Sequence, residues 1–230
     1  MRKLFILTAL LLASAGSMAQ KKPMKEFVDD LMSRMTLKEK IGQLNLQVAG
    51  DITTGSAQDT EVAGRIAAGE IGGVFNLKGA DKIRALQELA VKKSRLGIPL
   101  IVGMDVIHGY ETIFPIPLGL SCSWDMAAIE RSARIAAREA SADGINWTYS
   151  PMVDVCVDQR WGRVSEGNGE DPWLGGMIGQ AMVRGYQGDY SREDNIMACV
   201  KHFALYGAVE GGRDYNTVDM SRQRMYNQYL

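Results

Sequence analysis

The stretch Pro99-Leu100-Ile101-Val102-Gly103-Met104-Asp105 decides the fold class of this chain. Between its proline and its aspartate there is no polar side chain, and such a continuous apolar run is typical of a strand covered on both faces. A strand with one wet face would alternate between apolar and polar residues. Strands covered on both faces belong to parallel sheets flanked by helices, so the stretch predicts an α/β fold.

Comparable apolar runs recur before and after this stretch. Together they predict strands near residues 44–48, 71–76, 99–105, 146–155 and 196–203. Longer segments with apolar residues at spacings of three and four separate them, and this alternation predicts a TIM-like (β/α)8 barrel, present as an incomplete N-terminal portion of about five βα units. An open doubly wound sheet fits the same alternation, but it typically has a glycine-rich phosphate turn after its first strand, and none is found there.

Three connecting helices are predicted between these strands, over residues 81–95, 124–143 and 171–188. Asp125 and Asp171 are N-cap candidates, Pro172 suits a first helical position, and Gly97 suits a left-handed C-cap. Two further helices precede the first strand. One covers residues 24–35, and Thr36-Leu37-Lys38-Glu39 has the spacing of a capping box that opens the other.

The first nineteen residues have the pattern of a cleavable signal peptide. Arg2 and Lys3 precede an apolar run, and Ser17-Met18-Ala19 places small residues at a cleavage site. The run is too short to span a hydrocarbon core of about 30 Å, although a buried first helix is the alternative. We therefore expect cleavage after Ala19, one domain over residues 20–230, and a periplasmic or secreted protein without a lipid anchor.

The balance of charges argues against an anionic partner. The chain has 26 Lys and Arg against 27 Asp and Glu, with no basic stripe that would favour nucleic acid or a membrane surface. A neutral substrate fits this balance. The three cysteines, Cys122, Cys156 and Cys199, lie among apolar or small residues without metal or redox spacing, so buried thiols are expected in preference to a disulfide.

Polar residues follow three of the predicted strands. They occur at residues 105–109, 158–166 and 201–203. In a parallel barrel the loops after the strands form the active site, so these residues are the candidates for function.

These candidates lie inside long strings that resemble glycoside hydrolase family 3, most closely its periplasmic β-glucosidases. The strings are G-M-D-V-I-H-G with F-P-I-P-L-G-L, S-P-M-V-D-V, R-W-G-R-V-S-E-G-N-G-E-D-P, and V-K-H-F-A-L-Y-G-A-V-E-G-G-R-D-Y-N-T-V-D-M-S. They cover nearly all of residues 20–230, in the family's order. The resemblance implies a retaining, exo-acting enzyme that hydrolyses terminal β-D-glucosyl residues of oligosaccharides or glycosides.

The resemblance further implies that Asp105, Arg163, Lys201 and His202 bind the sugar. A carboxylate accepts hydrogen bonds from two hydroxyls, whereas Lys201, Arg163 and His202 donate to others. Lys201 and His202 are neighbours, and neighbours in a regular strand point to opposite faces. A distorted backbone is therefore expected there, with non-proline cis peptides as one form of it.

Other residues in these strings receive supporting roles. His108 is expected to be structural, and Trp161 is the tryptophan considered for stacking at the rim of the site. An ion pair of Arg163 with Glu166 or Glu170 is compatible with sugar binding. The family's usual D-P-R-W-G-R reads Asp158-Gln159-Arg160-Trp161-Gly162-Arg163 here, and the lost proline affects the rigidity of the loop more than the assignment.

The two carboxylates that perform hydrolysis are not assigned in this chain. A retaining glycosidase needs a nucleophile and an acid/base about 5 Å apart. The family's nucleophile lies in an S-D-W-like or S-D-H-like motif, which does not occur in residues 1–230, and its acid/base glutamate lies in a second α/β domain. Both are expected beyond Leu230, together with the rest of the barrel, so the chain is expected to be inactive alone. No cofactor or metal is expected.

Several other functions compete with this interpretation. A β-xylosidase carries the same motifs, and the sequence does not decide the sugar. A noncatalytic sugar-binding protein would keep the four binding residues without a nucleophile. A β-N-acetylglucosaminidase is disfavoured because Lys201-His202-Phe203 is not followed by P-G-H-G. A phosphate-handling barrel lacks a glycine-rich loop.

Overall fold

The computed structural model describes residues 23–49 and 61–230. The expected signal peptide lies outside the described residues. The chain divides into two compact units, residues 1–40 and 41–230. Within the described ranges, no helix is both long enough and apolar enough to cross a membrane.

In the first unit, the predicted helix is α2, Met24–Arg34. None of its residues is buried, and the side chains of its apolar face, such as Phe27, remain about half exposed. The capping box is confirmed: Glu39 Oε2 accepts from the Thr36 amide at 2.8 Å, and Thr36 Oγ1 accepts from the Glu39 amide at 3.2 Å. It opens α3, Leu37–Gly42.

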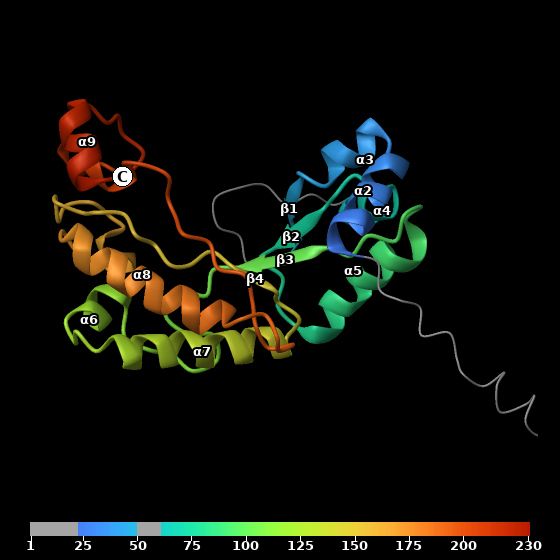
Figure 1. Cartoon of the computed structure of the whole chain (residues 1–230), viewed down its shortest axis with the longest axis horizontal. Coiled ribbons are helices and arrows are strands. Elements are labelled where there is room, and N and C mark those ends of the chain that lie inside the picture. The colour runs from blue at the N-terminus through green and yellow to red at the C-terminus, as the bar shows by residue number, and fades with distance from the viewer. Residues whose placement is uncertain (1–22, 50–60) are drawn as a thin grey trace, which may run out of the picture. The chain divides into compact units, whose positions relative to one another are not determined.

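The second unit is built on a parallel sheet whose strands follow chain order (Figure 1). These are β1 (Leu46–Val48), β2 (Gly73–Phe75), β3 (Ile101–Met104) and β4 (Trp147–Thr148). Four of the predicted strands are thereby confirmed, although each is shorter than its apolar run. The α/β class is confirmed with them.

The fifth predicted strand, residues 196–203, is an irregular segment beside β4. It forms isolated parallel bridges, of Met197 with Trp147 and of Lys201 with Met152. Backbone hydrogen bonds connect them: the Cys199 amide donates to Ser150 O at 2.9 Å, and the Val153 amide donates to Lys201 O at 2.8 Å. The segment therefore continues the sheet in the parallel direction without regular strand geometry.

The remaining helices of this unit are α4 (Val62–Ala67), α5 (Ala80–Lys93), α6 (Pro117–Ser121), α7 (Met126–Ala142), α8 (Pro172–Gln187) and α9 (Arg222–Gln228). Helices α7 and α8 lie side by side (Figure 1). The predicted N-caps are confirmed, because Asp125 accepts from the Ala128 amide at 2.9 Å and Asp171 accepts from two amides of α8. The predicted C-cap is wrong: Gly97 has a positive φ of 63°, but α5 already ends at Lys93, and its C-cap is Ser94 in an extended conformation.

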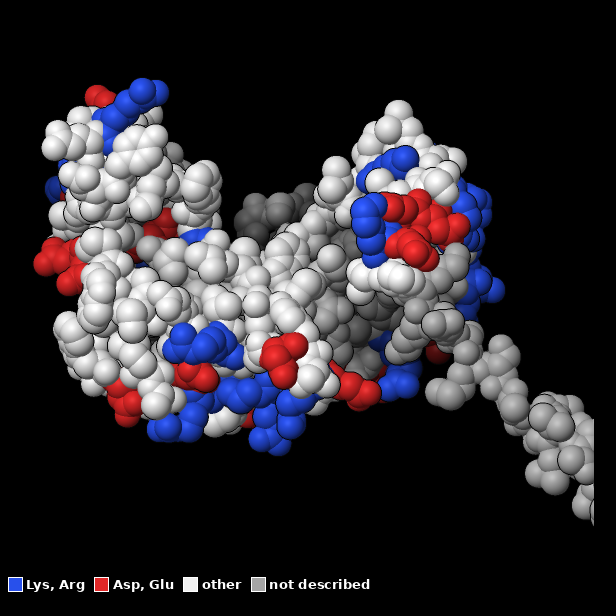
Figure 2. All heavy atoms as spheres, in the orientation of Figure 1, with Lys and Arg blue, Asp and Glu red and all other residues white. Residues whose placement is uncertain are grey.

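The main core joins the sheet to α5, α7 and α8, through side chains such as Val74, Val102, Ile129 and Ile178. A second, smaller apolar cluster contains Met152, Cys156, Trp161 and Val209. Figure 2 shows acidic and basic side chains interspersed along α7, without a field of one sign there.

The burial of the cysteines corrects one expectation. Only Cys156 is buried, whereas Cys122 is exposed and Cys199 is half-buried. All three thiols are free, as expected. Cys122 is the C-cap residue of the short helix α6.

Candidate functional site

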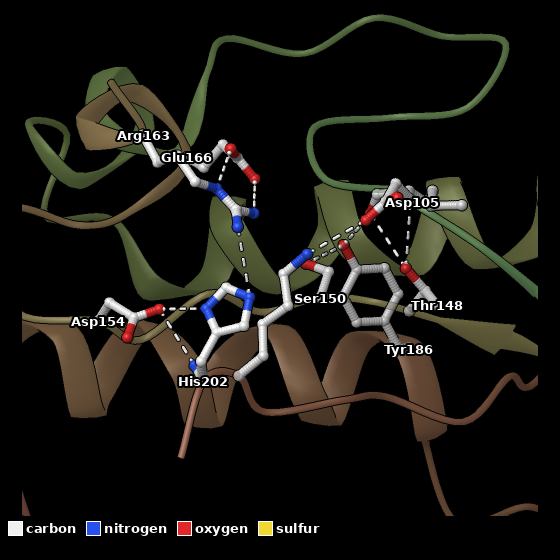
Figure 3. Close-up of polar contacts among 10 residues, drawn as sticks. Asp105, Thr148, Ser150, Asp154, Arg163, Glu166, Tyr186 and His202 are labelled. Carbon is white, nitrogen blue, oxygen red and sulfur yellow. Dashed lines mark hydrogen bonds and ion pairs between the residues drawn. The ribbon is translucent and has the colours of Figure 1, made fainter. Parts of the chain in front are cut away.

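The candidate site lies where neighbouring strands end (Figure 3). Asp105 directly follows β3, and Lys201 and His202 lie at the end of the segment that runs beside β4. Arg163 precedes the 3-10 turn η1, Val164–Glu166. The parallel direction of these segments brings residues that are far apart in sequence to one edge of the sheet.

Lys201 and Asp105 form an ion pair. The ammonium Nζ lies 3.1 Å from Asp105 Oδ1. The Lys201 side chain is only 12% exposed, whereas that of Asp105 is 41% exposed. Asp105 therefore keeps a carboxylate surface open to solvent while its orientation is set by the mostly buried lysine.

His202 is fixed by Asp154. One carboxylate oxygen, Oδ2, accepts from the His202 amide at 3.1 Å and from ring Nδ1 at 2.7 Å. The Asp154 side chain is 2% exposed. Because Nδ1 donates to this carboxylate, Nε2 is the ring nitrogen that faces the rest of the site (Figure 3).

Arg163 is held by a two-bond ion pair with Glu166. Nε and Nη2 donate to the two carboxylate oxygens at 2.7 and 2.8 Å. The pair lowers the pKa of Glu166 and raises that of Arg163, so both stay charged. The remaining guanidinium nitrogen, Nη1, lies 3.5 Å from His202 Nε2.

The four predicted site residues are thus brought together in two adjoining pairs. Asp105 pairs with Lys201, and Arg163 contacts His202. The charge of Lys201 also contributes to the lowered pKa of Glu166, which indicates that the two pairs share one electrostatic neighbourhood. The result is a carboxylate, an ammonium, a guanidinium and an imidazole at one edge of the sheet.

The backbone at this edge is irregular, as the Lys201-His202 adjacency predicts. The Lys201–His202 and Phe203–Ala204 peptides are cis, and so is Ser150–Pro151. Lys201 reaches Asp105 while its neighbour His202 reaches Asp154 and Arg163.

Buried hydroxyls support the loop that follows Asp105. Tyr186 Oη, from α8, donates to Val106 O at 2.8 Å and lies 3.1 Å from Ser150 Oγ, whose hydroxyl can donate to it. Thr148 Oγ1 accepts from the Val106 amide at 3.3 Å. Val106, the residue after Asp105, is therefore hydrogen-bonded to both β4 and α8, which fixes the backbone position of Asp105 (Figure 3).

Two expectations about neighbouring aromatic residues have different outcomes. His108 Nδ1 lies 3.0 Å from Phe114 O, a contact within its own loop that fits a structural role. The suggestion that Trp161 stacks at the rim is wrong, because Trp161 is only 1% exposed. Its ring fills the smaller apolar cluster instead.

Tyr206 and Asp214 also belong to the site, but they were not among the residues predicted from the strand ends. Tyr206 packs on both Arg163 and His202, and its hydroxyl donates to Asp214. Both lie in an irregular segment, where no periodicity indicates which side chains face inward. Among the described residues, no group of three or more His, Cys, Asp or Glu side chains is arranged to hold a metal ion.

Comparison with known proteins agrees with this geometry. The model of the glycosyl hydrolase family 3 N-terminal domain matches residues 36–230. A periplasmic β-glucosidase of Salmonella typhimurium is 47% identical over 205 residues, which are 89% of this chain and 26% of the relative. A β-xylosidase of Formosa agariphila is 34% identical over 65% of this chain and 22% of its own length.

Solved structures show the same likeness. A mutant β-glucosidase of Listeria innocua, in complex with laminaribiose, superimposes with a TM-score of 0.81 and 44% identity, over 90% of this chain and 30% of that chain. This chain therefore spans less than a third of the length of these relatives. From the family match over residues 36–230, this chain belongs to glycosyl hydrolase family 3.

Proposed function

We propose that this chain is the N-terminal part of a secreted β-glucosidase and that Asp105, Arg163, Lys201 and His202 bind the sugar ring beside the bond to be hydrolysed. The observation that carries the proposal is the meeting of these four groups at the ends of parallel strands. The likeness to β-glucosidases, one of them solved with laminaribiose, supports terminal β-glucosyl residues as the substrate.

The chemistry of the four groups suits a neutral sugar. Asp105 accepts hydrogen bonds from hydroxyls, and Lys201 and Arg163 donate charge-assisted ones. Each charge is already balanced by a partner within the site, Asp105 with Lys201 and Arg163 with Glu166. A charged substrate would disturb this balance, whereas hydroxyl groups leave it intact.

Three carboxylates of this site each contact another of its side chains. Asp105 binds Lys201, Asp154 binds His202, and Glu166 binds Arg163. Retaining hydrolysis needs a free nucleophile and a free acid about 5 Å apart. We infer that both come from residues beyond Leu230, which also complete the (β/α)8 barrel and supply a second α/β domain.

The likeness to a β-xylosidase of Formosa agariphila keeps β-xylosides as the second candidate substrate. The residues proposed to bind the ring are the same for either sugar. We further propose export through residues 1–19, in keeping with a periplasmic relative.

Hydrolysis of 4-nitrophenyl β-glucoside and β-xyloside tests the proposal. The protein from the full source reading frame is compared with the 230-residue chain, and each is prepared with Lys201→Met and with Lys93→Met, an exposed control on α5. We expect turnover only in the longer protein, fastest on the glucoside, and a loss of about 100-fold in Lys201→Met alone.

Two other outcomes have definite meanings. Binding of glucose without turnover by the longer protein would replace the hydrolase with a noncatalytic sugar-binding protein. Turnover by the purified 230-residue chain would overturn the assignment of the catalytic carboxylates to later residues.

A further inference from the structure

Tyr206 contacts both members of the Arg163–His202 pair. It opens the 3-10 turn η2, Tyr206–Ala208, shortly after the cis peptides. Its ring lies edge-on to the His202 imidazole, with centroids 4.8 Å apart at 87°. The Arg163 guanidinium carbon lies over the same ring at 5.4 Å from its centroid.

Trp161 and Asp214 in turn fix the position of Tyr206. It packs edge-to-face on the buried Trp161, with centroids 5.2 Å apart. Its hydroxyl donates to Asp214 Oδ1 at 2.7 Å, and the same oxygen accepts from Trp161 Nε1 at 2.9 Å and from the Tyr215 amide at 3.1 Å. Asp214 thereby ties the ring to the small apolar cluster.

The protonation states fit this arrangement. Burial and the hydrogen bond to Asp214 raise the pKa of Tyr206 to about 12, so the hydroxyl keeps its proton and donates. Burial alone would raise the pKa of Asp214, but the hydrogen bonds from Tyr206, Trp161 and Tyr215 together lower it. Asp214 therefore remains an acceptor at neutral pH.

The Tyr206 ring contacts the parts of Arg163 and His202 that their carboxylate partners leave unfixed. Glu166 fixes one edge of Arg163, and Asp154 fixes Nδ1 of His202. The guanidinium carbon of Arg163 lies over the Tyr206 ring and the His202 imidazole meets that ring at nearly a right angle, and both contacts are sensitive to ring orientation. An aliphatic residue of similar volume would fill the same space without setting either orientation.

We propose that Tyr206 is a positioning residue that aligns Arg163 and His202 for the sugar, and that Asp214 fixes Tyr206 through its hydroxyl. This inference rests on the proposed sugar-binding role of Arg163 and His202.

The test uses the protein from the full reading frame. Tyr206→Leu removes the ring, Tyr206→Phe keeps the ring and removes the hydroxyl, and Asp214→Asn weakens the acceptor. Tyr226→Leu is the control, because Tyr226 is 64% exposed on α9. The measurements are kcat and KM on the aryl β-glycosides, the dissociation constant for glucose, and the melting temperature.

We expect Tyr206→Leu to lower kcat about 10- to 100-fold with a smaller change in KM, because misplaced groups mainly reduce the rate of the bound substrate. Tyr206→Phe and Asp214→Asn should each fall between the wild type and Tyr206→Leu, because each removes or weakens the hydrogen bond that fixes the ring. Equal melting temperatures of Tyr206→Leu and Tyr206→Phe would separate positioning from folding. If Tyr206→Leu does not fold, Asp214→Asn against Tyr226→Leu decides the question.

The outcomes distinguish this inference from the proposed function. An active wild type with an equally active Tyr206→Leu would overturn positioning and leave the β-glucosidase intact. A wild type that binds glucose without turnover, with weaker binding in Tyr206→Leu alone, would keep positioning and overturn hydrolysis. A wild type that neither binds nor hydrolyses would overturn both.

Discussion

Asp154 accepts both the backbone amide and the ring Nδ1 of His202 on a single carboxylate oxygen. This one atom therefore fixes the position of the His202 backbone and the direction of its ring. The carboxylate is almost fully buried, so solvent cannot replace it.

Asp154→Ala is expected to lower the free energy of unfolding by about 2 kcal/mol, because a buried hydrogen bond to a charged group is lost and Nδ1 is left without its acceptor. Urea denaturation of the purified protein measures this. Asp154→Asn is the matched variant: its amide oxygen can still accept, so a smaller loss is expected. Equal stability of Asp154→Ala and wild type would contradict the structural role.

Glu166 is expected to contribute stability that depends on pH. Its hydrogen bonds with Arg163 lower its pKa below the ordinary 4.5 of the unfolded chain. The folded state thus binds its proton less readily than the unfolded state, so the contribution is complete above pH 4.5 and is lost as pH falls through the folded-state pKa. In Glu166→Gln this contribution is absent at every pH.

The measurement is the difference in unfolding free energy between wild type and Glu166→Gln across a pH series. Groups that titrate alike in both proteins cancel in this difference. We expect a constant difference at neutral pH, on the order of 1 kcal/mol for a partly exposed pair, that shrinks below pH 4.5. A difference that grows on acidification would contradict the lowered pKa.

Local chemistry explains how much of this fold could be predicted. Asp125, Asp171 and the Thr36–Glu39 box act on amides within three residues, so the sequence alone identifies them. The four strands were found because each lies in a run of mostly apolar residues, which is largely buried in β2 and β3. The predicted strands are longer than the observed ones because each apolar run continues into loop residues that are buried but do not pair with a neighbouring strand.

Long-range packing explains what could not be predicted. The sequence predicts that Asp105, Arg163, Lys201 and His202 gather, because parallel strands end at one edge and the motifs resemble a family. It did not place Trp161 beneath the site, since a tryptophan after a strand can stack on a ligand or fill a core. Burial decided this, through contacts with residues such as Val209 that lie far along the chain.

Gly103 in β3 and Gly176 in α8 are expected to respond to alanine in opposite directions. A Cβ at Gly103 would clash with the hydroxyl and ring of Tyr149, which makes edge contacts with Phe75 and Trp147, whereas nothing lies within 4 Å of a Cβ at Gly176. Gly103→Ala should therefore lower the free energy of unfolding by about 2 kcal/mol, and Gly176→Ala should raise it by about 0.5–1 kcal/mol because alanine favours the helix. Urea denaturation of both variants beside the wild type checks the pair. A Gly103→Ala variant as stable as the wild type would contradict the close packing of β3 against Tyr149. It would also remove the argument that a rigid strand end positions Asp105.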